Sequence, residues 1–444
     1  MGTNSSDLDV LNELYQKCKE NRISGNSDKA YSYFKICMKF LEINPIYTNL
    51  LKVNIPSDKL GLIYKLLEEF TIFSYYISKK KEGIIISDKL ILNNESRKYI
   101  NFNMLCSNQK YYMEKIPYKT KHQIKVKCEE HFIEMNPSII KLEKEGSTVK
   151  YLLNCRTSNF GLKPGGNYYC KNPDGIVDTI NYILELDNDF NIISNKEVID
   201  LSKNKLYQFR PIKGLEDLII FYHNNELYGT CTTLDTHENG TPQISLCKLE
   251  NIELDPFSVI AEKGHDKYII NEKVPLNIIE KGRPEKNWLP FSIGEGLNFI
   301  YSYSPTIIRQ YSNNKDEVGK TEILINNKTE LNFDRFRGSA GPIPFYLVNR
   351  NGWLVVVHEV SWNQDNSRVY THRFIYMNDE FKIISISLPW IFESLGIEFC
   401  RSMCHSHNDE IILTCGIKDE EAWCYIIDKK VIIEMLKGLE EFQL

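Results

Sequence analysis

Residues 217–234 read DLIIFYHNNELYGTCTTL, two runs of apolar and β-branched residues separated by Asn224 and Asn225. Runs of this kind recur from about residue 125 onward, with Gly, Asn and Asp between them, for example at 176–186, 299–304, 353–360, 369–377 and 410–417. Apolar runs bounded by turn residues are typical of β-strands. Because no long helical pattern interrupts them before the last dozen residues, the sequence predicts one large all-β region.

The length of this region decides its architecture. Roughly 320 residues of strand are too many for one sandwich, so the edge strands must be covered by closure or by radial repetition, as in a β-propeller. A blade of four strands with their turns occupies about 40–65 residues. The sequence therefore predicts a mainly β fold, a five-bladed β-propeller.

The first 110 residues have a helical pattern instead. Apolar residues at three- and four-residue spacing predict two helices within residues 8–41, separated by Gly25-Asn26-Ser27, and a third, strongly apolar helix over 60–77. The pair of helices resembles a single tetratricopeptide (TPR) unit. We expect a TPR-like helical cap domain at 1–110, which packs on the propeller and offers a surface for a protein partner, and a catalytic propeller domain at 111–444.

Charge and cysteine usage exclude several classes of protein. The 54 Lys and Arg residues against 59 Asp and Glu give a net charge of −5, which argues against a nucleic-acid surface. The N-terminus shows no secretory signal, and no apolar run approaches the ~18–20 residues that span a bilayer. The 12 cysteines lie scattered among strand-like segments, where reduced thiols are expected in the cytosol. We expect a cytoplasmic protein that binds neither nucleic acid nor a membrane.

Charged or imidazole side chains occur in or at the ends of the apolar strands about once per blade. They are Arg156, Asp217, Lys286, His358 and Asp419, separated by 61, 69, 72 and 61 residues. Such groups are costly to bury unless they are paired or face a wet cavity. The innermost strands of a propeller line its axis, so polar residues far apart in sequence meet there. The spacing predicts that the five side chains line one axial pocket.

Four segments carry a resemblance to a known family. They are GLEDLIIF (214–221), EKNWLPF (285–291), FRGSAGP (336–342) followed by WLVVVHEV (353–360), and RVYTHRFIYMNDEFKIISISLPWIF (368–392). In order and spacing they resemble the blade motifs of glycoside hydrolase family 130 and the related glycosyltransferase family 108. Those families are five-bladed propellers and contain β-mannoside phosphorylases, β-mannosidases and mannosyltransferases. The resemblance covers roughly residues 130–430.

The resemblance implies roles for particular side chains. Asp217 matches the Asp of the family's Glu-Asp motif and is the expected proton donor, acting directly or through a sugar hydroxyl. The residues expected to hold a phosphate are Lys286, His358, Tyr370 and Arg373. Glu216 and Asn287 are expected to bind the sugar. The once-per-blade spacing adds Arg156 and Asp419 to the substrate-binding residues, and the need for a further carboxylate adds Glu398.

One position departs from the family pattern. Leu218 and Ile219 follow Asp217, where the phosphorylases usually continue with Pro and Arg. An arginine expected in the anion or sugar site is therefore absent, which puts efficient use of free phosphate in doubt.

The chemistry of glycosyl transfer agrees with these residue types. The reaction passes through an oxocarbenium-like state and needs a carboxylic acid near the leaving oxygen and a nucleophile on the opposite face of the sugar. A phosphate in that place is held by Lys, Arg and His side chains. We therefore expect an enzyme that transfers a sugar, mannose or a related hexose, with inversion. Its donor is a sugar phosphate or a nucleotide sugar and its acceptor a glycan, and no metal or other cofactor is expected.

Two other functions remain open. A β-glycoside hydrolase of the same fold needs a second carboxylate to activate water, and Glu359, Glu398 and Asp419 are available for it. A non-catalytic propeller would instead bind a protein or glycan partner.

Single residues have structural alternatives as well. A structural role for Asp217 is an ion pair with Arg210. A structural role for His358 is that of a core histidine whose hydrogen bonds are all made within the protein. Strand alternation places Tyr370 and His372 on one face and Arg373 on the other unless a bulge intervenes.

Overall fold

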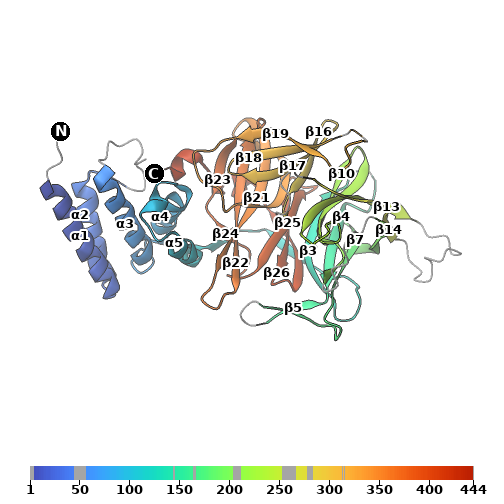
Figure 1. Ribbon diagram of the computed structural model, residues 1–444, viewed down its shortest axis with the longest axis horizontal. Helices are drawn as coiled ribbons and strands as arrows, with labels where there is room; N and C mark the ends of the chain where they lie inside the picture. The colour runs from blue at the N-terminus through green and yellow to red at the C-terminus, as the bar shows by residue number, and fades with distance from the viewer. Residues whose placement is uncertain are drawn as a thin grey trace.

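The computed structural model describes residues 5–44, 57–143, 146–163, 167–203, 212–252, 267–277, 284–312, 314 and 316–443, to which all that follows refers. Figure 1 shows two parts along the long axis of the molecule, the N-terminal helices at one end and the strands at the other. None of the helices in the described ranges has the length and apolar content that a membrane crossing requires.

Five helices form the N-terminal part: α1 (Ser5–Ile23), α2 (Ser27–Phe40), α3 (Ser57–Phe73), α4 (Lys80–Leu92) and α5 (Phe102–Gln109). The Asn26 side chain caps α2 by accepting the backbone N–H of Lys29, which explains the break between the first two helices. Their apolar faces pack on α3, where Phe34 stacks on Phe70 with 4.6 Å between ring centroids. The helical prediction for this region is confirmed, although α3 begins and ends earlier than expected.

The strands form five sheets of four or more strands and one hairpin, and the prediction of a mainly β protein is confirmed. We number the sheets by chain order.

Sheet 1 contains β3 (Ile133–Lys141), β4 (Tyr151–Ser158), β7 (Val177–Leu186), β8 (Ile192–Asp200), β9 (Ile212–Lys213), β13 (Glu250–Ile252) and β14 (Lys267–Ile270). Sheet 2 contains β10 (Glu216–His223), β11 (Glu226–Thr233), β12 (Gln243–Lys248) and β15 (Lys273–Pro275). Sheet 3 contains β16 (Leu289–Ile293), β17 (Gly296–Tyr303), β18 (Thr306–Tyr311) and β19 (Thr321–Asn327).

Sheet 4 contains β20 (Arg337–Leu347), β21 (Arg350–Trp362), β22 (Arg368–Asn378), β23 (Ile383–Ser387), β24 (Trp390–Ile391), β1 (Glu114–Lys115) and β28 (Leu436–Gly438). Sheet 5 contains β25 (Glu398–His405), β26 (Ile411–Ile417), β27 (Glu421–Ile427) and β2 (Thr120–Ile124). The hairpin pairs β5 (Phe160–Leu162) with β6 (Tyr168–Cys170), and a short helix, α6 (Lys429–Met435), follows β27.

We call β3, β10, β16, β20 and β25 the first strands of their sheets, leaving aside β1 and β2, which join sheets 4 and 5 from the start of the β region. These five strands follow one another in a ring. β3 contacts β10, β10 contacts β16, β16 contacts β20, β20 contacts β25, and β25 contacts β3 again. The ring is closed by the chain itself, because β2, which precedes sheet 1, pairs with β27 as the outer strand of sheet 5. The two ends of the β region are thereby held in one sheet.

Bulges interrupt four of these first strands, β20 among them, and the bulges on the other three strands concern the site. The pairing register shifts between Met135 and Ser138 on β3, between Glu216 and Ile219 on β10, and between Cys400 and Ser402 on β25. A bulge turns side chains out of the strict alternation of a strand. The residues inside these three bulges, Asn136, Asp217 and Arg401, meet in the site described below.

A buried ion pair joins the helices to sheet 4. Arg373 on β22 donates from Nη1 and Nη2 to the two oxygens of Asp88 on α4, at 2.5 and 2.6 Å, and from Nε to Glu359 at 2.6 Å. All three side chains are buried, and Gln109 donates a further hydrogen bond to Asp88. The expectation that Arg373 binds phosphate is therefore wrong: it lies on the face of β22 opposite Tyr370, and two carboxylates occupy its donors.

We predict that Asp88→Ala lowers the free energy of unfolding by roughly 3–5 kcal/mol, because it leaves part of the buried Arg373 charge without a partner. Urea unfolding followed by tryptophan fluorescence measures the effect. Glu95→Ala is the matched control, since it removes a solvent-exposed pair with Lys98 in the same part of the chain and should change stability little. Equal effects of the two substitutions would contradict the structural importance of the buried pair.

Candidate functional site

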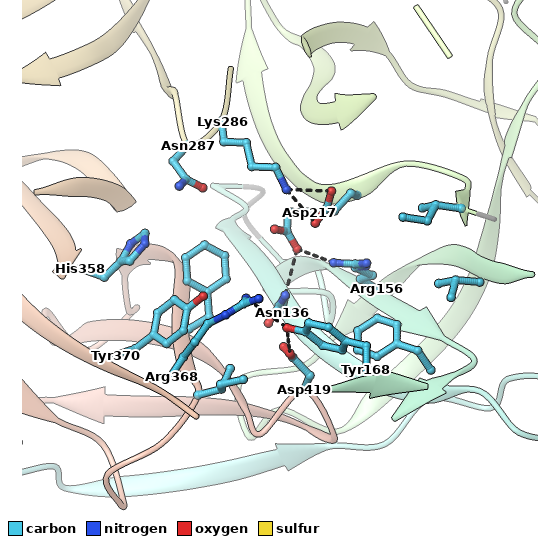
Figure 2. A pocket seen from close by; sticks show the side chains of 16 residues that line it. Asn136, Arg156, Tyr168, Asp217, Lys286, Asn287, His358, Arg368, Tyr370 and Asp419 are labelled. Carbon is cyan, nitrogen blue, oxygen red and sulfur yellow. Dashed lines mark hydrogen bonds and ion pairs between the residues drawn. The ribbon is translucent and has the colours of Figure 1, made fainter. Parts of the chain in front are cut away.

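A cavity of about 400 Å³ opens where the five sheets converge (Figure 2). Eight of the ten side chains predicted for the site line it: Arg156, Glu216, Asp217, Lys286, Asn287, His358, Tyr370 and Asp419. The other lining residues are Asn136, Phe160, Tyr168, Val177, Ile212, Arg368, Ile397 and Phe399. Residues of sheets 1, 2, 4 and 5 meet Lys286 and Asn287 from the segment that leads into sheet 3. Of the five spaced residues, Asp217 alone lies on a first strand.

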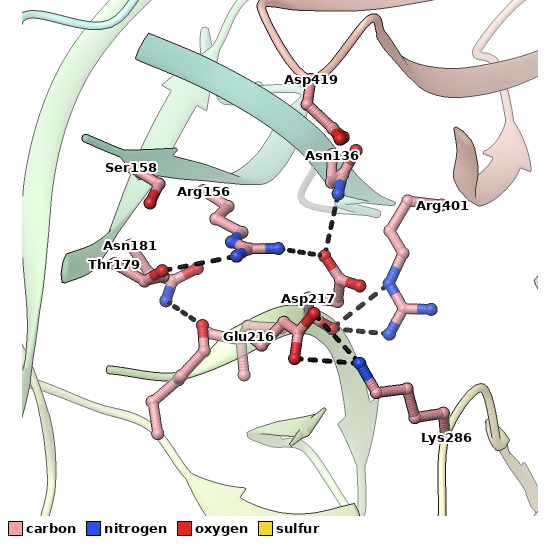
Figure 3. A network of polar contacts seen from close by, with 12 residues as sticks. Asn136, Arg156, Ser158, Thr179, Asn181, Glu216, Asp217, Lys286, Arg401 and Asp419 are labelled. Carbon is pink, nitrogen blue, oxygen red and sulfur yellow. Dashed lines mark hydrogen bonds and ion pairs between the residues drawn. The ribbon is translucent and has the colours of Figure 1, made fainter. Parts of the chain in front are cut away.

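Asp217 is the point on which the polar contacts converge (Figure 3). Its Oδ1 accepts hydrogen bonds from Arg156 Nη1 at 2.8 Å and from Asn136 Nδ2 at 2.9 Å. Its backbone carbonyl accepts two more from Arg401, from Nη2 at 2.6 Å and from Nε at 3.2 Å. Asp217 in sheet 2 is therefore held by side chains from sheets 1 and 5.

These contacts decide the charge of Asp217. Burial on its own would raise the pKa of the carboxyl, because desolvation disfavours the ionised form. Arg156, Arg401 and the hydrogen bond from Asn136 outweigh burial and lower the pKa of Asp217 to about 2. In the free protein Asp217 is a fixed negative charge, so the expected role of proton donor requires that a bound substrate raise this pKa.

Lys286 and Glu216 form an ion pair at the rim of the cavity. The Lys286 Nζ lies 3.2 and 3.1 Å from the two Glu216 carboxylate oxygens, and its side chain is 44% exposed. Exposed pairs of this kind are worth little. A bound anion can therefore replace Glu216 as the partner of Lys286.

His358 differs from its expected role. Its Nδ1 is hydrogen-bonded to Ser339 Oγ at 2.9 Å, and its ring stacks on Tyr370 with 5.4 Å between centroids. Burial, together with the charges of Arg337 and Arg401, lowers the pKa of His358 to about 3. His358 is therefore neutral near pH 7 and contributes a hydrogen-bonding ring to the cavity where a cation was expected.

Asp419 lies in the turn between β26 and β27 and is 8% exposed. Tyr168 donates a hydrogen bond to its Oδ2 at 3.3 Å, and Arg368 donates to the Tyr168 hydroxyl at 3.4 Å. Burial raises the pKa of Asp419 to about 6, with Arg156 opposing and Asp217 adding to the rise. The cavity thus holds two aspartates in opposite electrostatic surroundings.

Four lining residues have a left-handed backbone. Asn136, Asp217, Asn287 and Asp419 have φ of 46°, 53°, 65° and 52°, in a region that Asn and Asp adopt more readily than other residues with a Cβ. Such conformations cluster at functional sites. Gly416 on β26 leaves the space for one of them, since a Cβ at this glycine would collide with the Asn136 side chain.

Two further predicted residues lie elsewhere. Glu398 is fully buried and accepts the backbone N–H groups of Phe392, Glu393 and Ser394, so its substrate-binding role is wrong and its role is structural. Glu359, a candidate base for a hydrolase, is buried against Arg373 and is likewise absent from the cavity. Arg210, the alternative partner of Asp217, lies outside the described residues.

Sequence reasoning missed four polar residues of the site: Asn136, Tyr168, Arg368 and Arg401. Asn136 and Arg401 enter through bulges, which strand alternation does not predict. Arg368 shares a strand face with Tyr370, and this two-residue spacing was a usable signal. Tyr168 belongs to the short hairpin β5–β6, which carries no recurring spacing.

The sequence matches no family model, and no curated protein matches it. Among solved structures it is similar to a β-1,2-mannobiose phosphorylase from Listeria innocua, with 13% identity, 69% of this chain and 94% of that chain covered, and a TM-score of 0.41. It is also similar to two Leishmania mexicana proteins with TM-scores of 0.41, the mannose phosphorylase MPT-4 (12% identity, 72% and 92% covered) and the GDP-Man-dependent mannosyltransferase MPT-1 (10%, 70% and 90%). These are the kinds of enzyme that the sequence motifs resemble. Such distant likeness assigns no activity, so the functional argument rests on the cavity.

We predict that Asp217→Asn is less stable than the wild type at pH 7 and that the difference shrinks as pH falls. The folded-state pKa of about 2 lies below the ordinary 3.8, so the ionised carboxylate contributes about 2 kcal/mol above pH 4 that is lost as the pH falls toward 2. Urea unfolding between pH 7 and pH 3 measures it. A difference that is constant over this range would show that Asp217 titrates normally.

Proposed function

We propose that this protein is an enzyme that transfers a sugar, mannose or a related hexose, with inversion, from a sugar-phosphate or nucleotide-sugar donor to a glycan acceptor. One observation carries the proposal: a single cavity contains a partly exposed, ionised carboxylate, Asp217, a buried carboxyl, Asp419, and the accessible cations Lys286 and Arg368. Carboxyl groups suit a sugar undergoing transfer, and cations suit a phosphate.

The negative charge of Asp217 suits the sugar end of the donor. A carboxylate accepts hydrogen bonds from sugar hydroxyls and stabilises the positive charge that develops on an oxocarbenium-like ring. Glu216 and Asn287 line the cavity beside Asp217 and supply further groups for sugar hydroxyls.

The phosphate end of the donor belongs on the other side of the cavity. Figure 2 shows His358 and Tyr370 on one side of the cavity and Arg156 on the other, with the Arg368 side chain extending from the first side toward the centre. We assign phosphate contacts to Lys286, Arg368 and Tyr370, with neutral His358 as a hydrogen-bond donor. Arg368 takes the role that the family resemblance implied for Arg373.

A β-glycoside hydrolase is the second candidate. It is favoured by the presence of Asp419, which alone of the three proposed water-activating carboxylates lines the cavity. Transfer to water and transfer to a sugar acceptor are separated by product analysis.

For the architecture, we propose that the five sheets are the blades of a propeller, residues 111–444 the catalytic domain, and residues 1–110 a TPR-like cap. The ring of first strands supports the five blades. Exposed Ile23, Ile36 and Phe40 on the cap offer an apolar surface to a protein partner. All 12 cysteines are free thiols, which fits a cytoplasmic location.

We predict that Asp217→Asn lowers kcat for sugar transfer by roughly 10²–10⁴ with little change in donor affinity, because its carboxylate acts mainly on the transition state. Steady-state kinetics with α-mannose 1-phosphate, a nucleotide-linked mannose and manno-oligosaccharides measure the effect. Full activity of the variant on every substrate would reject both the transferase and the hydrolase.

We predict that Lys286→Ala weakens the binding of phosphate-bearing donors together with turnover, because this charge contact exists in the ground and transition states alike. Binding of neutral oligosaccharides should be unaffected. Lys248→Ala is the matched control, since Lys248 forms a similarly exposed pair with Glu226 outside the cavity. Equal effects of Lys286→Ala on charged and neutral ligands would remove Lys286 from the phosphate site.

A further inference from the structure

The two aspartates of the cavity have different partners. Asp217 forms an ion pair with Arg156 and accepts a second hydrogen bond from Asn136. Asp419 is equally enclosed, yet its one side-chain hydrogen bond comes from a neutral hydroxyl, that of Tyr168, and no ion pair to it is present in the part of the chain that the structure describes. Two carboxyl groups in one site whose surroundings differ in this way divide the acid and base roles between them.

The position of Asp419 gives it access to a substrate. It follows Lys418 in a tight turn at the end of β26, with a left-handed backbone that projects its side chain into the cavity (Figure 2). The hairpin β5–β6 brings Tyr168 over it, and Arg368 from sheet 4 contacts the same hydroxyl. Three separate elements therefore build its surroundings.

We propose that Asp419 is the group that carries the proton of the transfer step, while Asp217 remains ionised throughout. This inference rests on the proposed function. In synthesis, the acceptor oxygen forms a bond to the anomeric carbon, the bond from that carbon to the phosphate oxygen breaks, and its electron pair leaves with the phosphate. The acceptor hydroxyl proton passes to the Asp419 carboxylate. In the reverse direction phosphate attacks, and Asp419 returns the proton to the departing glycosidic oxygen.

Several charged and titratable groups face Asp419 and set its proton affinity. They are Arg156 on β4, Tyr168 on β6, Asp217 on β10, Arg368 and Tyr370 on β22, and Cys415 on β26. Burial and the negative charge of Asp217 raise the pKa of Asp419, whereas Arg156, the Tyr168 hydrogen bond and Arg368 lower it, and the balance is about 6. A group with this pKa can both take up and give back a proton near neutral pH. Asp217 cannot, because its pKa of about 2 keeps it ionised at neutral pH.

The two directions of the reaction must then depend on pH in opposite ways. Synthesis needs ionised Asp419, so kcat/KM with α-mannose 1-phosphate and a manno-oligosaccharide should fall as pH drops below about 6. Phosphorolysis of β-mannobiose needs the protonated form, so kcat/KM should fall as pH rises above about 6. The substrate phosphate also ionises in this pH range, and this ionisation is the same in the wild type and in Asp419→Asn. Dividing the wild-type kcat/KM by that of Asp419→Asn at each pH therefore cancels it, and both limbs should remain in this ratio.

The leaving group provides a second readout. Asp419→Asn should lower phosphorolysis of β-mannobiose by roughly 10²–10⁴, since the departing alkoxide is no longer protonated. Phosphorolysis of p-nitrophenyl β-mannoside should fall by less than about tenfold, because p-nitrophenolate leaves without a proton. Loss of both activities to the same extent would overturn the proton-carrying role.

Tyr168→Phe tests the same assignment without removing the carboxyl. The hydrogen bond from Tyr168 lowers the pKa of Asp419, so its loss should move both limbs to higher pH. Unchanged limbs in Tyr168→Phe, or a ratio of wild-type to Asp419→Asn kcat/KM that does not vary with pH while the wild type transfers sugar, would overturn the inference and leave the proposed function standing. Failure of the wild type to transfer sugar with any pair, including a nucleotide-linked mannose, would overturn the proposed function and this inference with it.

Discussion

The carboxylate of Asp217, which is largely enclosed with 15% of its side chain exposed, is the constraint on which the centre of the molecule depends. A charge in such a place is tolerated only where it is paired and hydrogen-bonded. Arg156 and Asn136 supply these contacts to its side chain, and Arg401 binds its backbone carbonyl. Because the partners belong to sheets 1 and 5 and Asp217 to sheet 2, the charge that the site needs for chemistry also fixes how three sheets meet. The bulges and left-handed backbone at these positions are the local cost of that arrangement.

A second buried charge connects the helices to the site. Arg373 on β22 binds Asp88 of α4 on one side and Glu359 of β21 on the other. Glu359 directly follows His358, and Arg373 lies three residues after Tyr370, so both strands that contact the helices also line the cavity. The helices are thus anchored behind the side of the cavity that His358 and Tyr370 line, which gives the N-terminal region a structural role.

The sequence predicted the features that depend on periodicity. The change from helical to strand spacing placed the helices and the β region correctly, and the regular spacing of Arg156, Asp217 and Asp419 brought together residues that line one cavity. It failed where tertiary contacts decide. The type of residue 373 suits phosphate, but its partner lies 285 positions away on a helix that no pattern linked to it. The position of Arg401 was not predicted because it lies in a bulge, and a bulge breaks the alternation from which a strand face is predicted.

The central claim is that this cavity moves a sugar between a phosphate and a sugar hydroxyl with inversion. The most direct measurement is proton and phosphorus NMR of the wild-type protein mixed with α-mannose 1-phosphate and manno-oligosaccharide acceptors. The account predicts that a β-linked product and inorganic phosphate appear together in equal amounts. Release of free mannose in place of a β-linked product would identify a hydrolase, an α-linked product would contradict inversion, and the absence of any product with sugar phosphates and nucleotide sugars alike would contradict the claim that the cavity is catalytic.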